Sequence, residues 1–185
     1  MGVGYNCHLP LVVEIGFGRG EFLLDLSERE PAQPFLGIEY SRKRVLKLAR
    51  KLARTESTNV RLVSEPAQEV VADTLLDASV ACFWINFPDP WPKKRHWRRR
   101  LVQPEFVALL TRRLMPGGRI EIATDHEGYA EWIDEVLREA AGLTNLHAPR
   151  PWLGEPPPGR KATSYELEWR ALGRSFHFFT YEKQG

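Results

Sequence analysis

The stretch from Asn86 to Arg100 reads NFPDPWPKKRHWRRR and combines a carboxylate, an indole and a run of cations. Prolines at positions 88, 90 and 92 exclude helix and sheet here, because proline lacks the backbone N–H and restricts the residue before it. Asp89 and Trp91 therefore belong to a stiff loop, and six of the eight residues that close the stretch are Lys or Arg. This pattern predicts contact with a flat, anionic partner, and RNA fits it better than a merely solvated surface does.

Three alternate glycines, Gly16, Gly18 and Gly20, mark a second candidate site near the start of the chain. They follow an apolar run over 11–15 and precede a helical pattern over 21–29. Such a turn lets the backbone approach a ligand beside a helix N-terminus, although a simple tight turn has the same pattern. The dinucleotide-binding pattern would have its third glycine at position 21, where this chain has glutamate, which argues against NAD.

Two acidic residues lie near these glycines. Glu39 ends the next apolar run, about twenty residues further on, where Rossmann-like folds bind ribose hydroxyls. Glu14 lies near the end of the first apolar run, where a charge is costly unless it has a partner such as an ammonium group or water. S-adenosyl-L-methionine carries both a ribose and an α-ammonium group, so we expect it as the cofactor.

Short apolar runs alternate with helical patterns along most of the chain. The runs, expected as strands, cover residues 11–15, 35–39, 60–63, 79–87, 119–124 and 176–181, and the helical patterns cover 21–29, 42–54, 104–114 and 129–140. This alternation predicts an α/β fold with a doubly wound, mostly parallel sheet that binds ligands at the carboxyl ends of its strands. Glu14, Glu39, Asp89 and Asp125 all fall at such ends, so we expect them to meet at one edge.

Length and composition are those of one domain over residues 1–185, with a short N-terminal arm over 1–10 and a Pro-rich, mobile loop over 149–161. The net charge is only +2, so the positive charge is local. Two cysteines make no disulfide framework, and no His or Cys spacing suits a metal. Without an export signal or a run of ~20 apolar residues, we expect a cytoplasmic protein with no membrane contact and no evident obligate protein partner.

The segment Asn86–His96, taken together with Glu14–Gly20, resembles the bacterial tRNA (guanine-N7-)-methyltransferases. The likeness extends from about Leu11 to the end of the chain and includes the segments 123–125 and 163–166. It implies the Rossmann-like class I methyltransferase fold, with a mostly parallel seven-stranded sheet and a late antiparallel strand. It also implies transfer of a methyl group from S-adenosyl-L-methionine to N7 of the guanosine at position forty-six, in the variable loop of tRNA.

The resemblance also assigns roles to residues of this chain. The cofactor contacts that it implies are Glu14, Gly16, Gly18, Gly20, Glu39, Ala67, Asn86 and Asp89, and Asp89 is also the catalytic candidate. The substrate contacts are Lys93, Asp125, Thr163, Ser164, Tyr165 and Glu166, and the tRNA phosphate contacts are Lys94, Arg95, His96, Arg98, Arg99 and Arg100. The family usually has aspartate before the alanine that follows the third strand. Here Pro66 precedes Ala67, so Glu65 or backbone groups are alternatives for holding adenine.

Guanine N7 has an in-plane lone pair and no proton, so its attack on a sulfonium methyl needs no strong general base. We expect catalysis to depend on alignment and on a carboxylate that favours the positively charged methylated purine, and both Asp89 and Asp125 are candidates. Extracting a guanine from folded tRNA costs roughly a few kcal/mol, which stacking on Trp91 or Trp97 would offset.

Two other functions fit parts of the pattern. Methyltransferases that act on exocyclic base amines also carry a proline-containing motif after the fourth strand, typically with a second proline where this chain has Trp91. A catalytically silent RNA-binding protein of the same fold is the other alternative, and Pro66 is its only support.

Overall fold

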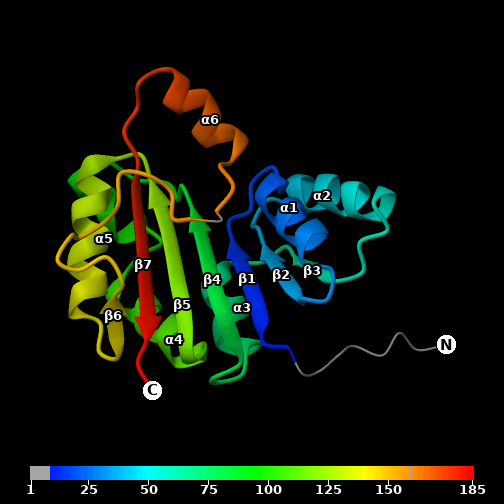
Figure 1. Cartoon of the computed structure of the whole chain (residues 1–185), viewed down its shortest axis with the longest axis horizontal. Coiled ribbons are helices and arrows are strands. Elements are labelled where there is room, and N and C mark those ends of the chain that lie inside the picture. Colours follow the sequence, from blue (N-terminus) through cyan, green and yellow to red (C-terminus); the bar gives the residue numbers. More distant parts are fainter. Residues whose placement is uncertain (1–8, 159) are drawn as a thin grey trace.

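The computed structural model describes residues 9–158 and 160–185, so most of the arm expected over 1–10 lies outside the described residues. One seven-stranded sheet has the order β3-β2-β1-β4-β5-β7-β6 (Figure 1). The strands are β1 (Leu11–Ile15), β2 (Phe35–Ile38), β3 (Val60–Val63), β4 (Val80–Asn86), β5 (Leu114–Thr124), β6 (Leu143–Asn145) and β7 (His177–Lys183). Strands β1 to β5 pair in parallel, and β7 runs antiparallel to both β5 and β6. The predicted fold class is confirmed.

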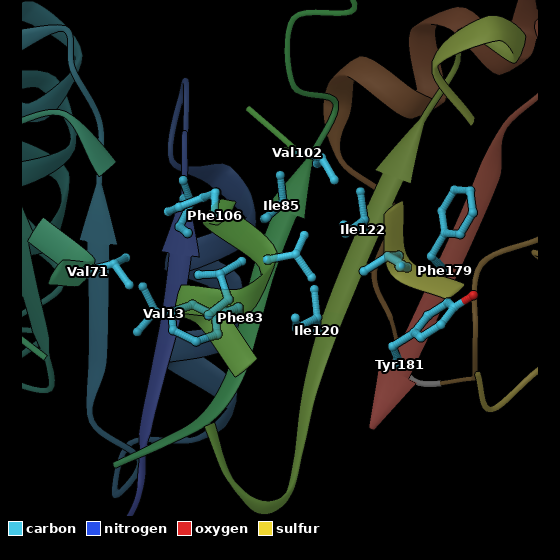
Figure 2. Close-up of a cluster of buried hydrophobic side chains, with 14 of the residues drawn as sticks. Val13, Val71, Phe83, Ile85, Val102, Phe106, Ile120, Ile122, Phe179 and Tyr181 are labelled. Atoms are coloured by element: carbon cyan, nitrogen blue, oxygen red, sulfur yellow. The ribbon is translucent and has the colours of Figure 1, made fainter. Parts of the chain in front are cut away.

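Helices cover both faces of this sheet. The helices are α1 (Glu21–Arg29), α2 (Arg42–Arg54), α3 (Ala67–Asp73), the 3₁₀ helix η1 (Lys94–Arg99), α4 (Pro104–Arg113), α5 (Glu127–Glu139) and α6 (Ser164–Ala171). Of these, α1 to α5 pack on the two faces, and α6 lies beyond the carboxyl ends of the strands (Figure 1). Because successive strand residues point to opposite faces, Val13 packs in one apolar cluster while Val12 packs against another. The first cluster joins the strands to α3, α4 and α5 and contains Val13, Phe83 and Ile120 (Figure 2). The second joins the opposite face to α1 and α2.

The expected elements appear with two kinds of difference. The strand expected over 119–124 begins five residues earlier, at Leu114, where the helix expected to include that residue has already ended. Its first part is irregular, because the pairing with β4 shifts register between Val80 and Cys82. Four short elements were not predicted: α3, η1, β6 and α6. They are too short for a hydrophobic period to be recognised in the sequence.

The described part of the Pro-rich segment expected over 149–161 passes in front of the strands on its way from β6 to α6 (Figure 1). Leu153 pairs with Phe178 of β7 through two backbone hydrogen bonds of 2.9 Å, so part of the segment is held as an extra edge contact. Its mobility stays a prediction. Among the described residues, no helix is both long enough and apolar enough to cross a membrane.

Candidate functional site

The glycine turn after β1 needs glycine for its backbone geometry. Gly16, Gly18 and Gly20 have φ angles of 73°, 56° and 72°, in the left-handed region that other residues rarely adopt. A Cβ added at Gly20 would also meet the Leu48 side chain at 2.4 Å, so α2 packs directly on this turn. The turn leads into the N-terminus of α1 and places backbone N–H groups at the carboxyl edge of the sheet.

Glu14 is a buried carboxyl group with an unused oxygen. Its residue is 2% exposed, and Oε1 accepts a hydrogen bond of 3.2 Å from Asn86 Nδ2. The other oxygen, Oε2, is buried and has no hydrogen-bond partner within the described part of the chain. Burial raises the pKa of Glu14 to about 7, while the Asn86 hydrogen bond opposes that rise. A cationic partner would satisfy the free oxygen and favour the ionised form.

Glu39, in contrast, already has partners. Its carboxylate accepts backbone hydrogen bonds from Gly18 at 3.0 Å and Ser41 at 2.9 Å, and it pairs with Arg44 at 3.5 Å. These contacts fix the carboxylate where β2 ends, against the glycine turn. The arrangement suits a rigid acceptor for hydroxyl groups.

Two hollows open at the carboxyl edge, and they adjoin because Gly16, Asn86 and Asp89 line both. The first has a volume of about 530 Å³ and is lined by Glu14, the glycine turn, Asp125 and the start of α6. The second has a volume of about 360 Å³ and is lined by residues that follow β2, β3 and β4, including Glu39, Glu65, Pro66, Ala67, Gln68 and Trp91. Such a two-part site can hold two ligands that meet beside Asp89.

The loop that carries Asp89 has an uncommon backbone. Phe87 and Trp91 have φ angles of 52° and 43°, a conformation that costs roughly 1–3 kcal/mol for each non-glycine residue. Phe87 packs on Tyr165 and Phe176, with ring centroids 5.1 Å and 5.6 Å apart. Packing therefore holds the loop, while Asp89 itself is exposed between the hollows.

Arg100 does not lie on the surface expected of a phosphate contact, and this prediction needs correction. The residue is 2% exposed, and its guanidinium lies 4.5 Å from the Trp97 ring centre and 4.9 Å from that of Tyr129. Its Nε donates to the Pro90 carbonyl at 2.9 Å, and burial lowers its pKa. Arg100 thus ties the Asp89 loop to α5. Trp97 packs into the same cluster, 6.2 Å from Trp132, which leaves Trp91 as the candidate for base stacking.

The remaining cations of the run are at the surface. Lys93, Lys94, Arg95, Arg98 and Arg99 are exposed, and His96 is partly buried against Trp91. The Arg99 guanidinium lies 5.0 Å from the centre of the Trp91 ring, at the rim of the second hollow. The 3₁₀ helix η1 therefore presents positive charge beside the hollows and turns Arg100 inward.

Asp125, at the end of β5, is held by residues from the C-terminal part of the chain. Tyr165 donates its hydroxyl to Asp125 Oδ2 at 2.9 Å, and Arg174 forms an ion pair with the same oxygen. Thr163 caps α6 by accepting from the Glu166 backbone N–H at 3.1 Å, and Ser164 hydrogen-bonds to Glu21 of α1. These contacts bring α6 over the first hollow.

Glu166 also departs from its expected role, because it is 0% exposed and lines neither hollow. Its carboxylate pairs with Arg160 at 2.6 Å and with Arg170 at 3.2 Å. Arg160, whose side chain is 2% exposed, also donates to Asn86 Oδ1 at 2.9 Å. A buried chain of polar contacts thus runs from α6 through Arg160 and Asn86 to Glu14, and Glu166 supports the site without facing a substrate.

The structure therefore brings together most of the predicted site residues. The first hollow is lined by Glu14, Gly16, Gly18, Gly20, Asn86, Asp89, Asp125, Thr163, Ser164 and Tyr165, and the second adds Glu39 and Ala67. The sequence missed several residues that also line the first hollow, among them the charged residues Arg44, Glu168 and Arg174. Arg174 follows the helix capped at position 163, and no sequence period marks it. Its ion pair with Asp125 at the first hollow reveals it.

The donor set fits S-adenosylmethionine. The orphaned Glu14 oxygen suits an α-ammonium group, and the fixed Glu39 carboxylate suits ribose hydroxyls. Ala67, beside Pro66 and Glu65, lines the part of the second hollow suited to a purine.

The sheet order and the position of the hollows define a Rossmann-like methyltransferase fold. The crystal structure of the 16S rRNA methyltransferase KamB has a TM-score of 0.70 at 15% identity, over 98% of this chain and 91% of that chain. The antibiotic-resistance methyltransferase Kmr has a TM-score of 0.66 at 16% identity, over 97% of this chain and 89% of that chain. These likenesses concern the fold.

Sequence comparisons give the family. The family model described as "Putative methyltransferase" matches residues 8–179. The tRNA (guanine-N(7)-)-methyltransferase of Bordetella pertussis is 43% identical over 94% of this chain and 67% of that protein. The protein of the same name from Halorhodospira halophila is 38% identical over 93% of this chain and 74% of that protein. The chain belongs to the bacterial tRNA (guanine-N7-)-methyltransferase family.

Proposed function

We propose that this chain, acting as one domain in the cytoplasm, is a tRNA (guanine-N7-)-methyltransferase that methylates the guanosine at position forty-six. The observation that carries the proposal is the meeting of two hollows beside Asp89, one of them walled by the orphaned Glu14 carboxyl. Membership of the family supports the same activity.

The cofactor is held by residues at or just after the carboxyl ends of three strands, β1, β2 and β3. Bound S-adenosylmethionine supplies a methyl group on a positively charged sulfur. Glu14 accepts from its ammonium group, Glu39 accepts from its ribose, and the backbone of the glycine turn approaches it closely because no side chains intervene. The Ala67 region bounds the adenine.

The acceptor side needs alignment more than proton transfer, since N7 of guanine carries a lone pair and no proton. Asp89 is the catalytic candidate. It is exposed where the two hollows adjoin, and its side chain forms no hydrogen bond with another described residue. Its negative charge favours the cation that forms on the purine. Asp125, fixed by Tyr165 and Arg174, is the candidate to accept from the guanine N1–H and amino group.

The tRNA side uses the outer surface of η1 and the start of α6. Lys93 and the exposed cations Lys94, Arg95, Arg98 and Arg99 contact phosphates, with His96 beside them, and Thr163, Ser164 and Tyr165 contact the nucleotide. Trp91 offers a stacking surface at the rim. Arg100 and Glu166 are left out, because both are buried.

The test is transfer of labelled methyl from S-adenosylmethionine to unmodified tRNA, followed by nuclease digestion. The proposal predicts 7-methylguanosine from the variable loop, and loss of turnover in Asp89→Asn with cofactor affinity reduced less than turnover. Label on an exocyclic amine would assign the chain to the other methyltransferase class. Tight tRNA binding without cofactor binding would identify a silent RNA-binding protein.

A further inference from the structure

Helix α2 carries a concentration of positive charge of which the site described above uses only Arg44. Seven of its thirteen residues are Lys or Arg and none is acidic: Arg42, Lys43, Arg44, Lys47, Arg50, Lys51 and Arg54. All of these except Lys51 are exposed. Arg44 pairs with Glu39 and Lys51 donates to the Arg19 carbonyl, but the other five form no salt bridge with any described residue. No salt bridge joins these five cations to an acid of the neighbouring α1, in which Asp25 pairs with Arg29 and Lys161.

Four of these cations form one stripe. Lys43, Lys47, Arg50 and Arg54 follow the spacing i, i+4, i+7 and i+11, so they share one face over about 16 Å of helix. The apolar face of α2 is already used, because Leu48 and Leu52 are buried against the sheet. A membrane-surface helix would need that apolar face free. Leu46, 50% exposed, is the one large apolar side chain that α2 leaves exposed, too little for a membrane-facing surface. A regular row of cations with so little exposed apolar surface fits a backbone of phosphates.

The position of α2 adds to this argument. Its first residues lie at the carboxyl edge, and Arg44 lines both hollows. The basic helix η1 lies on the other side, because Trp97 of η1 packs on Trp132 of α5. Figure 1 shows α2 and α5 at opposite ends of the strand edge, with β1 and β4 between them. Two positive surfaces therefore flank the hollows, and an extended polyanion seated over the hollows reaches both.

We propose that α2 is a second tRNA-binding surface, which contacts phosphates of the same tRNA whose guanosine enters the first hollow. The proposal rests on the proposed function for the identity of the RNA. Its chemistry is general: each phosphate contact releases bound counterions, so α2 contributes to the salt dependence of RNA binding. Its side chains carry no base specificity, so α2 contributes equally to every tRNA.

The test compares two double variants that each remove two positive charges. Lys47→Gln/Arg50→Gln alters the stripe, and Arg112→Gln/Arg138→Gln alters exposed positions in the last turns of α4 and α5. Glutamine has nearly the helix propensity of Lys and Arg, so both variants should fold, which the melting temperature checks. Binding of full-length unmodified tRNA is measured at several salt concentrations, and binding of S-adenosylmethionine is measured by calorimetry.

The stripe variant should bind tRNA roughly 5- to 30-fold more weakly near 0.1 M salt, from about 1–2 kcal/mol for two lost charge contacts. The slope of log K against log salt should fall by about 1.5–2, with cofactor affinity unchanged. The α4/α5 variant should bind tRNA like wild type. Equal tRNA affinity and slope in the two variants would overturn the inference, and so would a loss confined to binding of anionic vesicles. Wild-type protein that binds tRNA through the stripe but transfers no methyl would overturn only the proposed function.

Discussion

Glu14 and Glu121 are two buried carboxyl groups on the same face of the sheet. The pairing register places Glu14 beside Trp84 and Trp84 beside Glu121, so the two acids lie two strands, about 10 Å, apart. Burial raises the pKa of each to about 7. Their surroundings differ. Glu121 accepts a hydrogen bond of 2.7 Å from Thr180 and lines neither hollow, whereas Glu14 lines the first hollow and has a buried oxygen, Oε2, without a hydrogen-bond partner in the described part of the chain.

This difference separates two explanations for a raised pKa. A buried acid that is hydrogen-bonded within the sheet costs stability and indicates no ligand. A buried acid with an unused oxygen beside a hollow costs stability too, but a bound cation can recover that cost. The same arginine influences both acids, since the charge of Arg160 opposes the raised pKa of each.

Removing Arg160 should have the largest effect. Arg160→Ala removes the buried cation that pairs with Glu166, donates to Asn86 and influences Glu14 and Glu121. Breaking a buried ion pair lowers the free energy of unfolding by about 3–5 kcal/mol. Urea unfolding followed by circular dichroism measures this loss. Arg119→Ala is the control, because its ion pair with Glu182 is half-exposed and worth under about 1 kcal/mol. If Arg160→Ala does not fold, the double variant Arg160→Met/Glu166→Gln should. Equal losses in the Arg160 and Arg119 variants would contradict the buried network.

The pH dependence of the free energy of unfolding should report the raised pKa values of both Glu14 and Glu121. Each carboxyl has a pKa near 4.5 when unfolded and about 7 when folded, so the folded protein holds more protons between these values. The free energy of unfolding should therefore fall as pH rises from about 4.5 to 7, by up to ~3 kcal/mol for each group. Glu14→Gln and Glu121→Gln should each flatten the curve. A curve unchanged by both substitutions would show that neither acid is protonated in the folded protein.

Substitution of Glu14 should weaken cofactor binding, whereas substitution of Glu121 should not. Glu14→Gln removes a charged hydrogen bond, worth roughly 1.5–3 kcal/mol, so S-adenosylmethionine should bind about 10- to 150-fold more weakly. Glu121→Gln should leave the affinity unchanged. Binding of 5′-methylthioadenosine, which has the adenosine part but no ammonium group, should not distinguish Glu14→Gln from wild type. A similar loss for both ligands would mean that the substitution distorts the site generally.

The smallest effect is expected from removing the hydrogen bond that Thr180 donates to the Glu121 carboxylate. Thr180→Val keeps the shape and removes the donor, which should raise the pKa of Glu121 further and cost about 1 kcal/mol above pH 7. Stability at pH 5, where Glu121 is protonated, should change less. Equal losses at pH 5 and pH 8 would indicate a packing effect unrelated to the carboxylate.

The sequence predicted those parts of the site that depend on short-range order. A strand followed by alternate glycines fixes Glu14 and the turn, and parallel strands bring Glu39, Asp89 and Asp125 to one edge. The direction in which each side chain of η1 points was not predictable. Arg98, Arg99 and Arg100 are identical in the sequence, yet only Arg100 turns inward to the aromatic residues of α5.

The buried polar network from Glu166 through Arg160 and Asn86 to Glu14 could not be predicted from the sequence either. Arg160 and Asn86 are 74 residues apart, and no local period links an arginine in a Pro-rich segment to a strand end. Glu166 was predicted to face substrate because its position matches a family motif, and a motif does not specify burial. Both facts follow only from the packing of α6 against the sheet.

Glu14 is the proposed partner of the cofactor's ammonium group, and proton release on cofactor binding tests this role directly. Calorimetry of S-adenosylmethionine binding near pH 6.5, in buffers with different ionisation enthalpies, counts the protons released. Most Glu14 carboxyls are then protonated while the free α-ammonium is charged, so wild type and Glu121→Gln should release most of one proton and Glu14→Gln almost none. No release from wild type, or equal release from Glu14→Gln, would contradict the account.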